Sequence, residues 1–414
     1  MSEIRVTSVG GENGGDRVGL TTGLTVGPLT GTTGIGATIT HQGHAQFAGV
    51  CTATSFSGSG ENLTGISSPL SFRNKIINGA MTVSQRHGTT VVTGVNATGY
   101  RIDRWTHQMA SVNSAFSVSQ STDSPDGFGN SYKIDVTTAD TSLSAAHAHF
   151  FRQKIEGQNL QDFAKGTSSA KQFALSFYVK TNKTGVYTVE MYDIDNNRAI
   201  SKTFTVADSN WNRYTIIFPA DTTGAFGNDN GNSLVVQFFL SAGSNYTNNG
   251  TFNNSAWGSL SGKSRVSSSN VNFADSTSNN WYLTGVQLEV GDTATSFEHR
   301  SHGEELARCQ RYYERIPISI NEIFLFGVNQ FSSAGSIRFP FKVSKRAVPS
   351  AVSIDNASFD YYKVAGSGSN NSSSFTVSSF TTEAMEIKSA GAAANGVFWC
   401  HKSATGYIDA TAEL

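Results

Sequence analysis

The chain has 414 residues, of which 15% are charged, and a formal net charge of −1 at pH 7. An average soluble protein has about 25% charged residues, so much of this surface must form hydrogen bonds through uncharged side chains. No basic run is longer than two residues. This disfavours a nucleic-acid partner, because phosphate neutralisation needs clustered Lys and Arg.

Membrane and disulfide-rich classes are disfavoured as well. The longest apolar run, Leu234 to Leu240, is far shorter than the ~18 residues of a membrane span. Residues Met1 to Arg5 lack a signal-peptide layout, so we expect a soluble product made in a cytosol. The three cysteines fit neither a disulfide framework nor a zinc site, and no cofactor is expected.

Residues 1–67 contain short β-like pieces broken by glycine, such as Leu24–Val26 and Ala37–Thr40. A single copy of this segment buries too little apolar surface to offset the entropy of ordering it. One interpretation is an attachment and shaft segment that orders by intertwining with other copies, which predicts a homotrimer. The other is a flexible linker. The alternating β-branched residues favour the first interpretation.

Residues 72–300 are predicted to form one β-sandwich, because many short strands are separated by turn signals. A short helical turn is expected over 158–165, and Asn228–Asn280 is expected to be mainly surface loop. The predicted strands are Thr82–Ser84, Asp103–Gln108, Ala115–Gln120, Tyr132–Val136, Ala148–Lys154, Ala174–Thr181, Gly185–Tyr192, Ala199–Val206, Arg213–Pro219, Leu234–Leu240 and Trp281–Val290.

The strand Trp281–Val290 is apolar on both faces, so it is predicted to lie inside the sandwich. Because side chains alternate along a strand, Trp281 and Leu283 are predicted on one face. The other face would carry Tyr282, Thr284, Val286, Leu288 and Val290. A linking helix is then expected over 301–316, ended by Pro317. Leu306 and Tyr313 on that helix are the predicted oligomerisation residues.

A distal β domain is predicted over 317–414, making the chain all-β apart from the linking helix. Its expected strands are Ile323–Phe326, Ser336–Phe341, Ala351–Ile354, Phe375–Val377, Ala384–Ile387, Val397–His401 and Tyr407–Leu414.

Metal sites are not expected from the motifs present. Asp193 to Asn197 begins like a calcium loop, but Arg198 and Phe204 stand where that loop needs Gly and Glu. A hairpin turn explains it better. The pair His147 and His149 resembles metal-binding pairs of some fibre tips, but its position favours ordinary histidines on a strand face.

Catalytic motifs are also absent from the sequence. The acidic candidates for glycoside cleavage are scattered, namely Asp103, Glu156, Asp193, Glu289 and Glu298. Asp103-Arg104-Trp105 is read as a core corner, with the Arg104 guanidinium over the Trp105 ring and held by Asp103.

Three stretches resemble bacteriophage tail fibre and related virion appendage proteins. They are Asn74–Arg86 with Gly99–Trp105, Gln153–Lys180, and the run from Gly285 to Glu314 that reads GVQLE, AT, FE, EL and CQRYYE. Gly49–Thr64 looks like segments of cyanophage structural proteins. The sandwich itself resembles carbohydrate-binding modules.

The resemblance implies a non-enzymatic, trimeric tail fibre that is part of the virion and adheres to the host surface. Its partners would be a tail or adaptor protein, bound through 1–67, and a host glycan or protein. The candidate sugar-stacking residues are Tyr361, Tyr362, Trp257 and Tyr246, because they lie in or beside polar loops. Two alternatives are a head or neck appendage without a receptor role, and a capsule-depolymerising spike.

Overall fold

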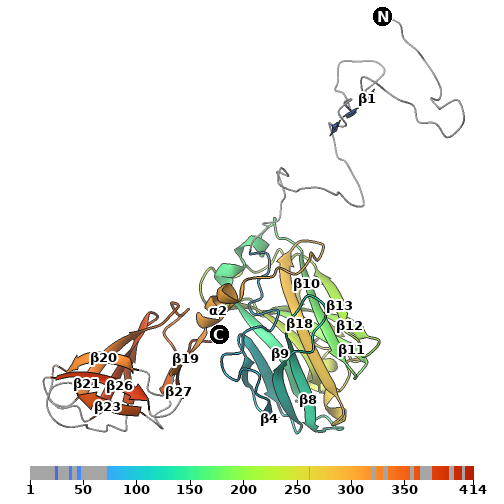
Figure 1. Cartoon of the computed structure of the whole chain (residues 1–414). Helices are drawn as coiled ribbons and strands as arrows, with labels where there is room; N and C mark the ends of the chain where they lie inside the picture. The colour runs from blue at the N-terminus through green and yellow to red at the C-terminus, as the bar shows by residue number, and fades with distance from the viewer. Residues whose placement is uncertain are drawn as a thin grey trace, which may run out of the picture. The chain divides into compact units, whose positions relative to one another are not determined.

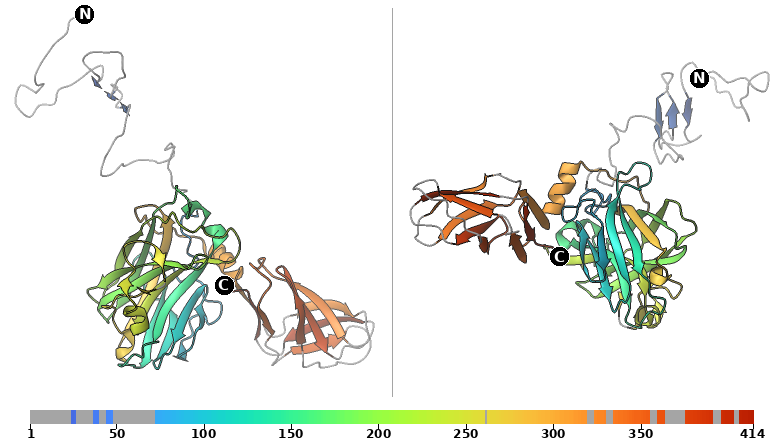
Figure 2. Two further views of the ribbon diagram at one scale, coloured as in Figure 1. Left: turned by 180° about the vertical axis from the view of Figure 1, so that it is seen from behind. Right: turned by 60° about the horizontal axis from the view of Figure 1, so that its bottom comes forward.

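The computed structural model describes residues 24–26, 37–39, 44–47, 72–260, 262–318, 323–329, 334–354, 359–363, 375–390, 396–402 and 406–414. The chain divides into two compact units, Met1–Ile66 and Ser67–Leu414. In the first unit, β1 (Leu24–Val26), β2 (Ala37–Ile39) and β3 (Ala45–Phe47) form a three-stranded antiparallel sheet, drawn in blue in Figure 2. Most of the predicted attachment segment 1–67 lies outside the described residues.

The second unit begins with two packed sheets (Figure 1). One has six strands in the order β13-β10-β18-β8-β7-β4. Their bounds are Asn212–Phe218, Phe173–Thr181, Asn280–Val290, Ser131–Thr138, Ala115–Ser121 and Val92–Val95. The predicted strand Thr82–Ser84 is wrong, because those residues form no strand; the main-chain N–H of Val83 instead donates to Oδ1 of Asn78 at 3.0 Å.

The other sheet has seven strands in the order β16-β12-β11-β14-β9-β6-β5. Their bounds are Gly258–Ser259, Arg198–Val206, Gly185–Asp193, Asn232–Ala242, Ala148–Glu156, Trp105–Ala110 and Gly99–Ile102. The smaller elements are η1 (Gly157–Asn159), η2 (Gln161–Phe163), α1 (Ser244–Thr247), β15 (Thr251–Phe252), β17 (Lys263–Ser264) and η3 (Phe273–Asp275). The all-β sandwich prediction is confirmed, and so is the helical turn near 158–165.

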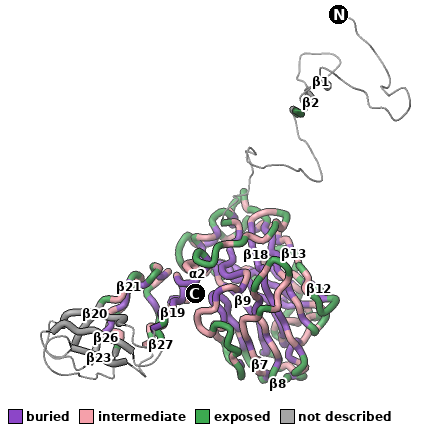
Figure 3. The backbone as a smooth tube through the Cα atoms, in the orientation of Figure 1, coloured by how far each residue is buried: buried purple, intermediate pink, exposed green. Residues whose placement is uncertain are grey.

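The core lies between the two sheets and is rich in aromatic rings. Trp105 stacks on Phe151 at 4.9 Å between ring centroids, and Phe151 stacks on Tyr132 at 4.6 Å. Trp281 is 0% exposed, and its strand β18 pairs with β10 on one side and β8 on the other. The prediction that this strand is interior is therefore confirmed, and Figure 3 shows β18 and β9 largely buried.

The expected single alternation along β18 is wrong because Gly285 interrupts it. The register against β10 shifts between the Ser176 and Tyr178 pairings, and Gly285 has φ +63°. A Cβ at Gly285 would meet the rings of Phe128 and Tyr178 at 2.8 Å. The bulge moves the core-facing positions from Trp281 and Leu283 to Val286 and Leu288.

The linking helix is shorter than predicted. Helix α2 covers His302–Gln310, with Ser301 as its N-cap, and β19 (Tyr313–Ile318) follows. The residues of β19 pair along its whole length with β27 (Gly406–Thr411), so the sheet overrides helix continuation there. Among the residues that the structure describes, no helix is long and apolar enough to cross a membrane.

The distal region consists of three small sheets, with orders β19-β27-β22, β20-β26-β23 and β21-β25-β24. The remaining bounds are β20 (Ile323–Asn329), β21 (Ala334–Pro340), β22 (Ala351–Ile354), β23 (Phe359–Lys363), β24 (Phe375–Phe380), β25 (Ala384–Ala390) and β26 (Gly396–Lys402). Its described core includes Ile316, Phe341, Met385 and Ile408. Strand β23 was not predicted.

Candidate functional site

The predicted sugar-stacking residues do not lie together. Trp257 is only 8% exposed, belongs to the sandwich core and donates its indole N–H to the Pro219 carbonyl at 2.9 Å. The expectation of an exposed ring at Trp257 is therefore wrong. Tyr361 and Tyr362 lie on β23, paired with Cys400 and Trp399 of β26, and their side chains are outside the described ones. Tyr246 lies on α1 and is half-buried against Phe239.

The predicted oligomerisation residues are already packed within one chain. Leu306 lies against a cluster containing Ile77, Cys309 and Tyr312. Tyr313 is 3% exposed and lies under the guanidinium of Arg86. The surface that they were expected to offer to other copies is thus largely covered, and the oligomeric state stays a prediction.

The outer side of the seven-stranded sheet carries a polar row that crosses several strands. Arg152 of β9 pairs with Gln237 of β14, and Gln237 pairs with Glu190 of β11. Their sequence neighbours, such as Phe151, Val236 and Val189, point into the core. Alternation along a strand therefore sends Arg152, Gln237 and Glu190 outward. We call this surface, with Tyr192 and Tyr246 beside it, the Arg152 face.

A loop residue completes the Arg152 face. Arg265 follows β17 and pairs with both carboxylate oxygens of Glu190, at 2.8 and 2.5 Å. Its guanidinium carbon lies 5.4 Å from the ring centroid of Tyr192 and 5.9 Å from that of Tyr246. The half-buried Tyr192 and Tyr246 thus lie beside the Arg265 guanidinium. The loop region around α1 contributes Tyr246 and Arg265 to this face.

Several polar atoms of the Arg152 face have no hydrogen-bond partner within the described residues. They are the buried atoms Oε1 of Gln237, Nε of Arg152 and Oγ of Ser201, and the Gln237 side chain as a whole is 1% exposed. Gln237 uses its amide nitrogen on Glu190, and Arg152 donates to Oε1 of Gln108 at 2.6 Å. The parts of this face that reach solvent are the half-buried Tyr192, Tyr246 and Arg152. They combine aromatic surface with a hydrogen-bond donor, which is what a polyhydroxylated ligand needs.

The calcium-like stretch Asp193 to Asn197 is a hairpin turn between β11 and β12, as predicted. The ammonium of Lys165 occupies its oxygens, at 2.5 Å from Asp193 and 3.1 Å from Asp221. It also donates to the carbonyls of Thr223 and Gly224 at 3.0 and 2.7 Å. A protein cation therefore neutralises this acidic turn from inside the fold.

His147 and His149 are both 0% exposed. His147 shares a hydrogen bond of 2.8 Å with Ser241, whereas His149 lies 5.4 Å from His107 between ring centroids. Burial lowers the pKa of His107 to about 3 and holds the pKa of His149 well below its usual range. These rings are neutral parts of the core. Within the described residues, no group of three or more His, Cys, Asp or Glu suits a metal ion.

The corner Asp103-Arg104-Trp105 is built differently from the prediction. Arg104 lies 3.4 Å from the Tyr312 ring centroid and pairs with Glu413 at 2.6 Å, so neither Trp105 nor Asp103 holds it. Asp103 instead accepts two hydrogen bonds from Gln85, each of 2.6 Å. Burial raises the pKa of Asp103 to about 6.

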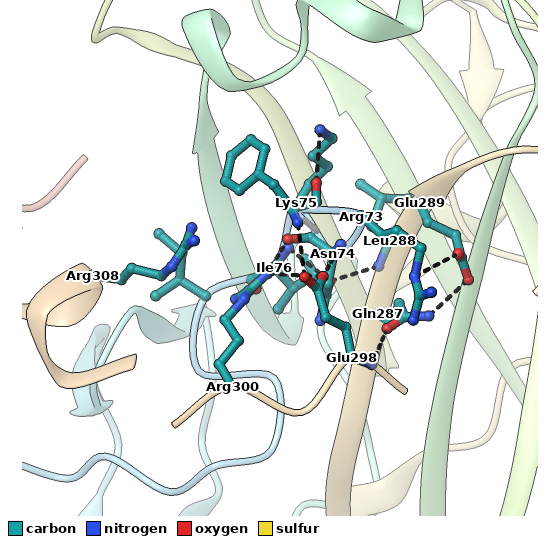
Figure 4. A network of polar contacts seen from close by, with 12 residues as sticks. Arg73, Asn74, Lys75, Ile76, Gln287, Leu288, Glu289, Glu298, Arg300 and Arg308 are labelled. Atoms are coloured by element: carbon teal, nitrogen blue, oxygen red, sulfur yellow. Dashed lines mark hydrogen bonds and ion pairs between the residues drawn. The ribbon is translucent and has the colours of Figure 1, made fainter. Parts of the chain in front are cut away.

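Figure 4 shows how the stretch that resembles fibre proteins fastens Arg73–Ile76 to β18. The Glu298 carboxylate accepts from the main-chain N–H groups of Phe72 and Asn74, at 2.8 and 2.6 Å. Glu289 accepts from the main chain and hydroxyl of Thr295, at 2.8 and 2.7 Å. Both carboxylates, considered above for catalysis, thus hold the backbone.

A hollow of about 600 Å³ lies at one end of the six-stranded sheet, lined by Lys171, Gln172, Glu289, Asp292 and Thr295 among others. Its lining contains no aromatic ring, so it offers hydrogen bonds without a stacking surface. The Arg152 face, in contrast, offers hydrogen-bonding groups together with aromatic rings.

Sequence reasoning found Tyr246 but missed Arg152, Gln237, Glu190 and Arg265. One signal in the sequence could have indicated this face. Gln237 is a polar residue in the middle of β14, with apolar residues before and after it along the strand. A polar side chain at such a position either forms a hydrogen bond with a buried partner or belongs to a functional surface.

Comparison with solved structures finds distant likenesses only. A family 11 carbohydrate-binding module of a cellulosomal cellulase from Clostridium thermocellum is 12% identical, with a TM-score of 0.25, covering 52% of this chain and 99% of that one. The CBM22-1 xylan-binding domain of Paenibacillus barcinonensis Xyn10C is 12% identical, with a TM-score of 0.24, covering 50% and 99%.

The apo form of a cyclase from Fischerella sp. is similar at the same level, with 11% identity and a TM-score of 0.28, covering 54% and 97%. No protein-family model and no curated protein sequence matches this chain. Likenesses this distant do not assign a ligand.

Proposed function

We propose that this protein is a non-enzymatic virion fibre subunit whose sandwich binds carbohydrate at the Arg152 face. The observation that carries the binding role is the polar row Arg152, Gln237 and Glu190 with Tyr192 and Tyr246 beside it. Sugars stack their C–H faces on aromatic rings and exchange hydrogen bonds with such polar groups.

The fibre role rests on a different observation. The stretch from Gly285 to Glu314 and the segment Asn74–Arg86 resemble tail fibre proteins, and the side chains that carry the likeness make the network of Figure 4. A trimer anchored to a tail by 1–67 would present several weak glycan sites at once, which raises its avidity for a host surface.

The binding role is tested by measuring the affinity of the full chain for immobilised glycans before and after Tyr192→Ser. Tyr178→Ser is the matched control, because Tyr178 is also half-buried but lies on the other sheet against Phe128. We expect Tyr192→Ser to weaken glycan binding by about 10-fold or more, with the control unchanged. Equal effects of the two substitutions on binding would contradict the proposed site.

The distal candidates Tyr361 and Tyr362 form a second arm of this test. A variant carrying Tyr361→Ser and Tyr362→Ser is compared with Tyr192→Ser for adsorption to host cells. Loss of adsorption in the distal variant alone would place the receptor site on the distal domain instead. Imaging of labelled chain in intact virions separates a tail fibre from a head or neck appendage.

A further inference from the structure

The Arg152 face carries more positive than negative charge. Its one acid, Glu190, is already paired with Arg265 and is 0% exposed. Arg152 donates to the neutral amide of Gln108, and no carboxylate among the described residues forms an ion pair with it. Arg152 is therefore a cation without a counter-charge on an otherwise balanced surface.

Lys154 is a second cation on β9, two residues after Arg152. It projects from the same side of the strand as Arg152, and its ammonium donates to the main-chain oxygen of Leu414 at 2.5 Å. Burial and then the charges of Arg152 and Arg104 lower the pKa of Lys154 to about 8. Lys154 is thus mostly charged at neutral pH.

Nearby acids are neutralised by other cations. Glu156, next on the same side of β9, accepts hydrogen bonds from Nε and Nη2 of Arg311 at 3.0 and 2.9 Å. Glu413 pairs with Arg104 at 2.6 Å and with Arg86 at 3.2 Å. Both carboxylates are thus paired with cations other than Arg152.

We propose that the ligand of the Arg152 face is an acidic glycan, whose sugar carboxylate pairs with the Arg152 guanidinium while Lys154 adds attraction. This inference rests on the proposed carbohydrate-binding role. The planar guanidinium matches a carboxylate in shape, and pairs of this kind are among the stronger hydrogen bonds in proteins. The sugar ring would then lie toward Tyr192 and Tyr246, with its hydroxyls toward Arg265.

The test uses glycan pairs that differ only in charge. Oligogalacturonate and oligomannuronate are each compared with the neutral oligosaccharide made by reducing their carboxyl groups. Affinities are measured for the full chain by calorimetry, with Arg152→Gln as the test variant. Arg213→Gln is the matched control, because Arg213 is an exposed strand arginine of the other sheet.

We expect at least one acidic oligosaccharide to bind about 10- to 100-fold more tightly than its neutral partner. Arg152→Gln should remove that preference and spare neutral binding, whereas Arg213→Gln should keep the preference. Added salt should weaken acidic binding only.

Each other result counts against a defined part of the account. Equal affinity for acidic and neutral partners would overturn the acidic-ligand inference and leave the binding role standing. A preference that survives Arg152→Gln would place the anion elsewhere and overturn it too. Absence of binding to every probe would overturn both the inference and the proposed function.

Discussion

Acidification tests how the core of the sandwich is built. His107 is 0% exposed, packs edge-on against Tyr132 and Phe151, and has no partner for either ring nitrogen among the described residues. Burial lowers its pKa to about 3, whereas an unfolded histidine titrates near ~6.5. The unfolded chain therefore takes up a proton first as the pH falls.

The difference between the folded and unfolded pKa values of His107 sets the sign and size of the change in stability with pH. Stability from neutral His107 is fully present above pH ~6.5 and is lost at about 1.4 kcal/mol per pH unit below it. At pH 5 the loss from His107 alone is about 2 kcal/mol. Asp103 acts in the opposite direction, because its raised pKa of about 6 makes the folded state take up a proton before the unfolded one.

The variant His107→Phe isolates the effect, because it keeps an aromatic ring against Tyr132 and Phe151. Urea unfolding of wild type and variant at about pH 7.5 and about pH 5 gives the pH dependence of each free energy of unfolding. Asp103 contributes to both proteins, so its effect cancels in the comparison. We expect wild type to lose about 2 kcal/mol more than the variant. Equal losses would refute the account of His107.

Four further predictions follow from the packing and charges. Trp281→Ala should lower the free energy of unfolding by ~3–5 kcal/mol, and an unchanged melting temperature would show that Trp281 is not a core residue. Lys165→Met should cost about 3–5 kcal/mol, because it leaves the buried Asp193 carboxylate without its cation, whereas Asp221 keeps Arg198; a variant as stable as wild type in urea would disprove that role. Acidic-glycan affinity should fall as the pH rises through about 8, since Lys154 then loses its proton, whereas a flat profile up to pH ~10 would exclude Lys154. Full-length protein should have the mass of a trimer in light scattering, and a monomeric mass would contradict the role given to 1–67.

Much of the sandwich was readable from the sequence, because its strands are apolar on the core side and end at turn residues. Strand β18 was placed within one residue of its observed bounds. The prediction of which residues face the core was wrong, because Gly285, with its positive φ, shifts the alternation in the middle of the strand. The end of α2 was missed because pairing with β27, more than 80 residues away, decides the conformation of Tyr313–Ile318.

The candidate site was less predictable than the fold. Tyr246 was found because it stands in a polar loop, but Arg152, Gln237 and Glu190 come from three strands far apart in the sequence. Only the pairing register brings them into one row. Trp257 was misjudged because its polar sequence neighbours gave no sign that its ring fills the core beside Phe173.

The central claim, that carbohydrate binds at the Arg152 face, is tested most directly by a crystal structure of the full chain with the tightest-binding oligosaccharide from the acidic pairs. The account predicts a sugar ring against Tyr192 or Tyr246, with its carboxylate at Arg152 and hydroxyls near Arg265. A sugar bound instead in the hollow lined by Lys171 and Thr295, or only on the distal domain, would contradict it.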